Sequence, residues 1–419
     1  MLAGWLVLPV HAADEAERGW YDDAWSYRKK ITFNSEFVGS DLGKFPVLVQ
    51  LDDAGVYDHA KEDGSDLRFT ESDGVTRIPH ELESNTDVWV RLTKLYANTD
   101  TSIYVYYGNP DADDDQDSGS VWNNRYTAVY HLNQDPDGVN RNSVGDRLHL
   151  DDNQGAVRHN RPGKIDQAVH MPNDNSWLGA TDHRDRFLSQ STGTVSAFFN
   201  ADSTQQYTTG RIFIDWQSRV SISLDTNAGN LLFQNYDADG AYDTISAPYE
   251  ANRWHHAVWR HGDGQLAAYL DGASLGQVAS GNTDDTNADF GIAPGWLLHG
   301  QVDEIRVSDV ARSGDWIKAE YISQCQCEDF VTISSEPETG DGVAAGETIS
   351  TDTSAIAATG GTTQTVASPL ESINNLFRIV NEREITFTEW SYWSQRVIAG
   401  EKPTLPELFG AMQYQALEN

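Results

Sequence analysis

The chain has 419 residues, which is too long for one hydrophobic core and predicts two or three domains. Its formal net charge of −35 argues against binding to nucleic acid or to an anionic membrane, because both need a basic surface. A solvated acidic surface of this kind suits a soluble protein outside the cytoplasm, and some of the acidic groups are candidates for binding Ca²⁺.

The N-terminal residues resemble a secretory signal. Leu2 to Val10 form a short apolar run, small residues follow it, and an acidic stretch begins at Asp14. We therefore predict a signal peptide over residues 1–12 and a periplasmic or secreted protein. Because no Lys or Arg precedes the apolar run, a start further upstream and a simple apolar end are the alternatives. No later stretch is as long as a membrane span, so none is predicted in the mature chain.

Residues 20–110 predict a domain of β-strands. Residues 27–33 alternate apolar and polar side chains over most of their length, as a half-buried strand does. Turn residues separate this run from the next ones, and short strands between turns are typical of a β-sandwich. The other strand-like runs are 46–51, 88–93 and 102–107. An acidic, polar stretch follows over residues 111–120.

A second β domain is predicted over residues 121–330. No helical crossover separates its strands, so we expect antiparallel sheets. Residues 315–323 have a short helical pattern after the last strand. The strand-like segments are 126–132, 168–171, 193–199, 212–216, 220–224, 231–236, 254–260, 266–270 and 301–307.

The C-terminal part predicts a linker followed by short helices. Residues 336–369 are rich in Gly, Thr, Ser and Ala, which favours a flexible linker. Residues 370–419 again carry large apolar side chains, at near-helical spacing in their first turns. Pro403 and Pro406 interrupt any long helix, so two or three short ones are predicted. Such a tail needs a surface to cover it, either the sandwich itself or a partner.

The two cysteines, Cys325 and Cys327, have one residue between them. A zinc site made of cysteines would need more ligands than these. In an oxidising compartment the pair is predicted to form a disulfide that ends the second domain. A bridge this tight is strained and easier to reduce, so a redox role is the alternative.

Several motifs of the first domain occur in an order that resembles a known family. The order begins with Trp25 to Ile31, continues through Phe45-Pro46 and Val88-Trp89-Val90, and ends with Tyr-Tyr-Gly-Asn-Pro at 106–110. It resembles an uncharacterised β domain of exported bacterial proteins. Some members of that family stand beside, or are fused to, proton-channel subunits of the MotA/TolQ/ExbB kind. The resemblance therefore implies such a membrane complex as one candidate partner, reached through residues 370–419.

The second domain also carries a series of family motifs. Ala128 to Leu132 opens the series, Arg253 to Val258 and Tyr269 to Gly272 lie in its middle, and Gly300 to Val307 closes it. The order is similar to the laminin-G-like branch of the concanavalin A-like lectins. The resemblance implies a jelly roll over about residues 125–315 that binds rather than catalyses, although a fold does not determine a function.

A calcium site is the candidate that the resemblance supports best. Asp303 matches the family's aspartate in the final strand, and Asn173 and Asp174 lie in a turn where oxygen ligands are expected. Calcium binds 6–8 oxygen atoms of this kind. The alternative is that Asp303 bonds to the backbone or to Arg306 and holds a loop.

Motifs for catalysis are mostly missing. The run His80-Glu81-Leu82-Glu83 lacks the second histidine of a zinc-protease helix, and no nucleophile elbow, P-loop or dinucleotide fingerprint occurs. His255 and His256 should point to opposite faces of a strand, with one buried and the other exposed. Asp303 and Glu304 should also point to opposite faces. Four tryptophans of the second domain are each expected to be either a core residue or an exposed ring that stacks on a sugar: Trp216, Trp254, Trp259 and Trp296.

The sequence thus predicts an all-β protein that is not an enzyme. An N-terminal β-sandwich-like domain precedes a laminin-G-like jelly roll, and a flexible linker leads to a short helical tail. The predicted function is non-catalytic binding of carbohydrate or another cell-surface ligand outside the cytoplasm. The alternatives are an accessory subunit of an energised MotA/TolQ/ExbB-type transport complex and a glycan-cleaving enzyme.

Overall fold

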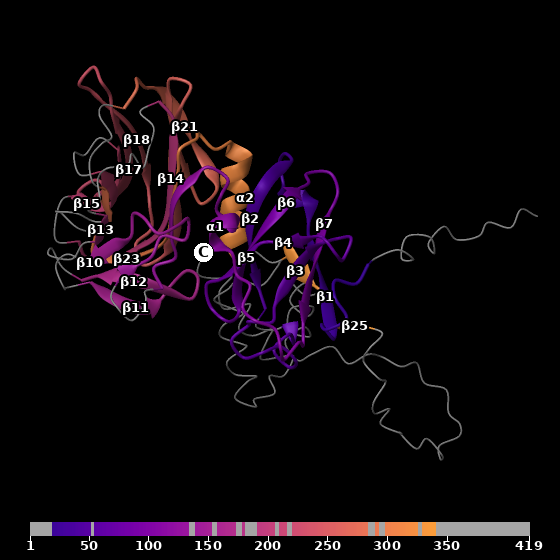
Figure 1. Ribbon diagram of the computed structural model, residues 1–419. Coiled ribbons are helices and arrows are strands. Elements are labelled where there is room, and N and C mark those ends of the chain that lie inside the picture. The colour runs from indigo at the N-terminus through magenta and orange to yellow at the C-terminus, as the bar shows by residue number, and fades with distance from the viewer. Residues whose placement is uncertain are drawn as a thin grey trace, which may run out of the picture. The chain divides into compact units, whose positions relative to one another are not determined.

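The computed structural model describes residues 19–51, 54–133, 139–152, 157–172, 178–180, 191–205, 209–215, 220–283, 290–292, 298–325 and 329–340. These residues form sandwiches of antiparallel sheets, which confirms the predicted all-β fold (Figure 1). The predicted signal peptide, the tail at 370–419 and most of the linker lie outside the described residues, so those predictions stay predictions.

The N-terminal domain has two sheets. One has the strand order β24-β1-β7-β3-β4 with β25 also paired to β1, and the other has the order β2-β6-β5. The first sheet contains β1 (Tyr27–Phe33), β3 (Arg68–Glu71), β4 (Arg77–Ile78), β7 (Thr101–Tyr107), β24 (Val331–Ile333) and β25 (Glu338–Thr339). The second contains β2 (Leu42–Gln50), β5 (His80–Leu82) and β6 (Asp87–Leu95). Two short helical turns are η1 (Ser35–Phe37) and α1 (Ser118–Val121).

Two strands of the N-terminal domain come from beyond the jelly roll in sequence. β24 pairs with the end of β1, where Ile333 lies opposite Ile31. β25 pairs with the beginning of β1, and there Glu338 accepts a hydrogen bond from Arg28 Nη2 at 2.6 Å. Residues 338–339 fall in the stretch predicted as a linker, so ordered pairing continues further along the chain than composition indicates.

The jelly roll consists of two larger sheets. One has the order β11-β12-β23-β14-β19-β20-β21 with β8 also paired to β23, and the other has the order β18-β17-β16-β15-β22-β13-β10-β9. The first contains β8 (Tyr126–Tyr130), β11 (Arg158–Pro162), β12 (Gln167–Met171), β14 (Gly193–Ala201), β19 (Trp254–Gly262), β20 (Gln265–Leu270), β21 (Ala273–Ala279) and β23 (Gly300–Ser308). The second contains β9 (Val139–Asn140), β10 (Leu150–Asp152), β13 (Leu178–Ala180), β15 (Thr209–Asp215), β16 (Val220–Asp225), β17 (Asn230–Tyr236), β18 (Tyr242–Pro248) and β22 (Phe290–Ile292).

Helix α2 (Gly314–Gln324) packs against strands of both domains (Figure 1). Its first turn is capped by the Ser313 hydroxyl, which accepts a hydrogen bond from Trp316 N. Toward the N-terminal domain, Trp316 packs edge-on against Phe45 of β2, with ring centroids 4.9 Å apart. Toward the jelly roll, Glu320 accepts a hydrogen bond from Ser196 of β14 at 2.6 Å. The helix therefore contacts side chains of both domains.

The central strands of the first jelly-roll sheet are buried on both faces, because α2 and the N-terminal domain cover their outer face. This burial contradicts the expectation that one of His255 and His256 is exposed, since they are 4% and 1% accessible. His255 Nδ1 lies 2.8 Å from Asp271 Oδ2, and His256 Nε2 lies 3.3 Å from Glu320 Oε1. Each histidine thus has a carboxylate partner on its own side of the sheet.

Candidate functional site

A group of buried acidic side chains surrounds one histidine where strands of both β domains meet. Glu83 follows β5, His131 follows β8, and Glu304 lies in β23. His131 Nδ1 lies 2.6 Å from Glu304 Oε1 and 3.2 Å from Glu83 Oε2. One ligand-type atom from each of the three lies within 4.8 Å of the others, and all three residues are buried. We refer to these three residues as the buried cluster.

A β-bulge in β23 places Glu304 in the buried cluster. The pairing of β14 with β23 shifts there, so that two residues of β23 lie opposite one of β14, and Glu304 takes a left-handed φ of 47°. Val302 and Ile305 both belong to the hydrophobic core between the two jelly-roll sheets. Asp303 and Glu304, which lie between them in the sequence, are therefore both on the opposite face of β23. The prediction that Asp303 and Glu304 point to opposite faces is therefore wrong, because the extra residue breaks the alternation.

Two tryptophans hold the carboxylates on the side of the N-terminal domain. His131 Nε2 lies 3.4 Å from Glu81 Oε2, and that oxygen accepts a hydrogen bond from Trp122 Nε1. Trp89 Nε1 donates to Glu83 Oε2 at 2.7 Å. The imidazole thus faces Glu81 with Nε2 and Glu83 with Nδ1, and an indole N–H orients each of these two carboxylates.

Arg306 supplies a fixed positive charge beside the buried cluster. Its Nη2 donates to Glu304 Oε2 at 2.6 Å and to Gln324 Oε1 at 2.9 Å. The guanidinium lies 4.3 Å from the ring centroid of Trp89 and 4.9 Å from that of Trp122. A planar guanidinium suits this position, because it donates hydrogen bonds in its plane and stacks its faces on aromatic rings.

Proximity and burial shift the pKa values of the buried cluster. Burial raises the pKa of Glu83, and the neighbouring Glu304 raises it further. Burial opposes ionisation of Glu304 as well, but His131 and Arg306 outweigh it and lower the Glu304 pKa. Burial opposes protonation of His131, yet Glu304, Glu83 and Glu81 raise its pKa well above the ordinary value. Without a bound cation, the favoured state is thus an ionised Glu304 beside a protonated His131.

Asp303, the predicted calcium ligand, is buried and bonded to the backbone. Its carboxylate accepts hydrogen bonds from Lys164 N at 2.7 Å, Ile165 N at 3.1 Å and Glu304 N at 2.9 Å. Burial, followed by the neighbouring Glu304 and Glu83, raises its pKa well above the ordinary value. These contacts are those of the loop-holding alternative.

The residues predicted to join Asp303 in a calcium site and Cys325 in a disulfide belong to segments outside the described residues. Asn173 and Asp174 lie outside the described residues. Cys325 is the C-cap of α2, and Cys327 lies outside the described residues. The calcium site and the Cys325–Cys327 disulfide both stay predictions.

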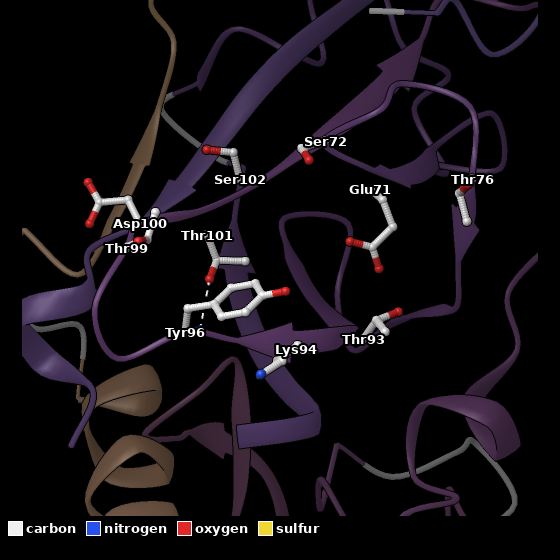
Figure 2. A pocket seen from close by; sticks show the side chains of 10 residues that line it. All are labelled: Glu71, Ser72, Thr76, Thr93, Lys94, Tyr96, Thr99, Asp100, Thr101 and Ser102. Atoms are coloured by element: carbon white, nitrogen blue, oxygen red, sulfur yellow. Dashed lines mark hydrogen bonds between the residues drawn. The ribbon is translucent and has the colours of Figure 1, made fainter. Parts of the chain in front are cut away.

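A pocket of about 500 Å³ opens on the surface of the N-terminal domain (Figure 2). It lies between the turn after β3 and the turn that joins β6 to β7. Figure 2 shows the Tyr96 ring extending across the pocket toward Glu71. Its lining residues are Glu71, Ser72, Thr76, Thr93, Lys94, Tyr96, Thr99, Asp100, Thr101 and Ser102.

Tyr96 is the aromatic side chain of this pocket, and it is 43% exposed. Its backbone N–H donates to Thr101 Oγ1 at 3.0 Å, which fixes the turn (Figure 2). Lys94 Nζ lies 4.7 Å from the ring centroid and 2.8 Å from Asp41 Oδ2. Glu71 Oε1 is buried and has no hydrogen-bond partner among the described residues. The pocket thus combines an accessible ring with hydroxyl groups and an unsatisfied carboxylate oxygen.

Two of the four tryptophans considered as sugar platforms, Trp254 and Trp259, lie among the described residues. Trp259 belongs to the jelly-roll core, and its Nε1 donates to Gln234 O at 3.1 Å. Trp254 is partly exposed at the start of β19, and Trp216 and Trp296 lie outside the described residues. A second pocket of about 500 Å³, lined by Lys61, Glu62, Asp63 and Asn85, has no aromatic lining residue.

Family models match two parts of the chain. Residues 167–318 match the model described as the concanavalin A-like lectin/glucanases superfamily. Residues 63–141 match a domain of unknown function, DUF2341, and this match extends beyond the N-terminal strands to include β8 and His131. None of the curated proteins matches the sequence significantly. No helix among the described residues combines the length and the apolar character needed to cross a membrane.

Solved structures with a similar arrangement include toxin and enzyme domains. The binding domain of Paraclostridial mosquitocidal protein 1 is 14% identical, with a TM-score of 0.40 over 48% of this chain and 52% of that one. The receptor-binding domain of botulinum neurotoxin type G is 12% identical, with a TM-score of 0.39 over 48% and 51%. Domain 4 of the arabinanase AbnA from Geobacillus stearothermophilus is 18% identical, with a TM-score of 0.34 over 46% and 97%.

This chain spans about half the length of the two toxin domains, and at these scores the likenesses carry no functional argument. The identity of the domains rests instead on the two family models and on the sheets. The chain contains a concanavalin A-like domain, matched over residues 167–318, and a domain of unknown function, matched over residues 63–141.

Proposed function

We propose that this is a non-catalytic protein that binds carbohydrate outside the cytoplasm, and that the pocket around Tyr96 is a binding site. The placement outside the cytoplasm rests on the predicted signal peptide, and N-terminal sequencing of the exported chain checks it. The concanavalin A-like description of the second domain supports a binding role in general. The observation that carries the proposal is the exposed Tyr96 ring inside a polar pocket.

The chemistry of the pocket suits a sugar. A sugar ring has an apolar face that packs against an aromatic ring and a rim of hydroxyl groups that need hydrogen-bond partners. Tyr96 supplies the ring, and the lining residues supply hydroxyl and carboxylate oxygens. A few placed polar groups around an accessible apolar surface are typical of small-ligand sites.

Tyr96→Ala is expected to weaken carbohydrate binding at least about fivefold, because truncating a central contact residue costs more than about 1 kcal/mol. Isothermal titration with soluble oligosaccharides and pull-down with insoluble polysaccharides measure the affinity. Glu71→Gln should weaken binding less, because it keeps one acceptor oxygen and removes the charge. Tyr242→Ala is the matched control, since Tyr242 is 52% exposed in the jelly roll.

Two results would contradict this proposal. If Tyr242→Ala abolishes binding while Tyr96→Ala does not, the site lies on the concanavalin A-like domain. If the wild-type protein releases reducing ends from any polysaccharide it binds, the protein is an enzyme and the non-catalytic part of the proposal is wrong.

The jelly roll is also proposed to bind Ca²⁺ through Asp303, Asn173 and Asp174. Ca²⁺ at one hundred times its dissociation constant should then stabilise the protein by about 2.7 kcal/mol. Differential scanning calorimetry before and after calcium addition measures this gain. The double variant Asn173→Ala/Asp174→Ala should abolish the gain while it leaves the backbone bonds of Asp303 intact. A wild-type melting curve that calcium does not move refutes the site.

A further inference from the structure

We propose that Glu83, His131 and Glu304 together bind one divalent transition-metal ion, for which Zn²⁺ is the best match. The three residues come from both β domains, so a single ion would join the domains. This site is separate from the carbohydrate pocket. It uses none of the predicted calcium ligands, although Glu304 directly follows Asp303 and donates its backbone N–H to that carboxylate at 2.9 Å.

The donor atoms favour zinc over calcium or magnesium. The site offers one imidazole nitrogen and carboxylate oxygens, which Zn²⁺ binds at about 2.0–2.2 Å. Calcium and magnesium prefer oxygen ligands throughout. Ligand atoms around a tetrahedral zinc ion lie about 3.3 Å apart at such bond lengths. His131 Nδ1 is already 3.2 Å from Glu83 Oε2, and Glu304 Oε1, at 2.6 Å, needs to withdraw by less than about 1 Å.

A second, independent observation is an orphaned oxygen atom that belongs to the same site. Glu83 Oε1 has no hydrogen-bond partner among the described residues, although the Glu83 side chain is 0% exposed. A buried acceptor without a partner is destabilising, because it has lost its hydration and gained nothing in return. Coordination by both oxygens of Glu83 would satisfy this atom and supply a fourth donor atom, with the two oxygens of the one carboxylate closer together than ideal tetrahedral ligands.

The surroundings of the site match those of protein-bound zinc. A metal-binding histidine usually directs its second nitrogen at a carboxylate, and His131 Nε2 faces Glu81 Oε2 at 3.4 Å. The ligating carboxylates are also oriented, Glu83 by Trp89 Nε1 at 2.7 Å and Glu304 by Arg306 Nη2 at 2.6 Å. These groups orient the donor atoms of all three ligands.

Complete burial indicates a structural rather than a catalytic ion. Catalytic zinc keeps a position open for water or substrate, whereas structural zinc is closed off by protein ligands. His131 is 5% exposed, and the side chains of Glu83 and Glu304 are 0% exposed. The ion should therefore enter while the domains assemble, and its binding should contribute to folding.

The test is metal loading of the full chain during refolding. Protein unfolded in denaturant with EDTA is refolded with Zn²⁺, dialysed against metal-free buffer and assayed by inductively coupled plasma mass spectrometry. We expect one equivalent of zinc in the wild type and less than a tenth of that in His131→Gln. Refolding with Co²⁺ should give visible ligand-field absorption that His131→Gln lacks.

Further variants separate loss of a ligand from general loss of stability. Glu83→Gln should lower zinc affinity at least 100-fold, because it removes a charge and a ligand atom. Trp89→Phe keeps every ligand but removes the indole N–H together with the five-membered part of the ring, so affinity should fall about 10- to 100-fold. His261→Gln is the matched control, since His261 is buried in β19 and lies outside the cluster, and it should retain one equivalent.

Wild-type protein that refolds to its native circular dichroism spectrum with Zn²⁺ but retains no stoichiometric metal overturns the proposal. So does His131→Gln if it holds as much zinc as the wild type. If only Ca²⁺ is retained, and Asn173→Ala/Asp174→Ala removes it, the jelly-roll site is the metal site and the cluster is not.

Discussion

Arg306→Leu is expected to lower the free energy of unfolding by about 4 kcal/mol, because it removes a buried ion-pair partner and leaves the Glu304 carboxylate with His131 as its remaining cationic neighbour. Arg306 is 2% exposed and bonds to Glu304 and Gln324. Its guanidinium also lies against two buried tryptophans, Trp89 and Trp122. Leucine fills part of this space but offers no hydrogen bond to either partner.

Urea denaturation in the presence of EDTA measures this effect without any contribution from bound metal. The matched control is Arg125→Leu, which removes an exposed arginine paired with Asp309 at 2.7 Å. Exposed ion pairs contribute little, so the control should leave the free energy of unfolding nearly unchanged. An Arg306 variant as stable as the Arg125 variant would show that Arg306 does not stabilise the region where the domains meet.

Trp316→Ala should lower the free energy of unfolding by a similar amount, about 4 kcal/mol, because it leaves a large cavity between α2 and β2. Trp316 is 6% exposed and packs against Phe45 and Tyr126. The guanidinium of Arg312 covers it at 4.2 Å from the ring centroid. Since α2 packs against both domains, the loss should also weaken their coupling.

Differential scanning calorimetry tests both parts of this expectation. The wild type should unfold in one cooperative transition, and the Trp316 variant should show two, one for each domain. Tyr242→Ala again provides the control, because that ring is largely exposed and its removal should barely change the melting curve. A single, slightly shifted transition in the Trp316 variant would mean that the helix does not couple the domains.

Local sequence patterns predicted most of the long elements. The run predicted as a strand at residues 27–33 is β1 with the same bounds, and the helical pattern at 315–323 is α2 extended by one residue at each end. Alternation and turn residues are local signals, so they need no knowledge of the partner strand. The hairpin strands β18 and β21 were missed, because they are polar and largely exposed and carry little apolar pattern.

The buried cluster was not predicted, although each member lies in a segment that drew attention. Glu83 belongs to the run His80-Glu81-Leu82-Glu83, which lacks the second histidine of a zinc-protease motif, and His131 and Glu304 lie in the family motifs of the jelly roll. Nothing local connects positions so far apart in the chain, because only tertiary packing brings them together. The bulge at Glu304 added a second obstacle, since the alternation rule assumes an unbroken strand.

The pairing of β24 and β25 with β1 has a consequence for how the protein is made. The N-terminal domain lacks two of its strands until the jelly roll that follows it has been synthesised. Until then β1 is an edge strand with unpaired backbone groups from Tyr27 to Phe33, which is a template for pairing with other chains. The N-terminal sheet can therefore be completed only after residues 331–339 have been synthesised, and the exposed edge of β1 needs protection from aggregation until then.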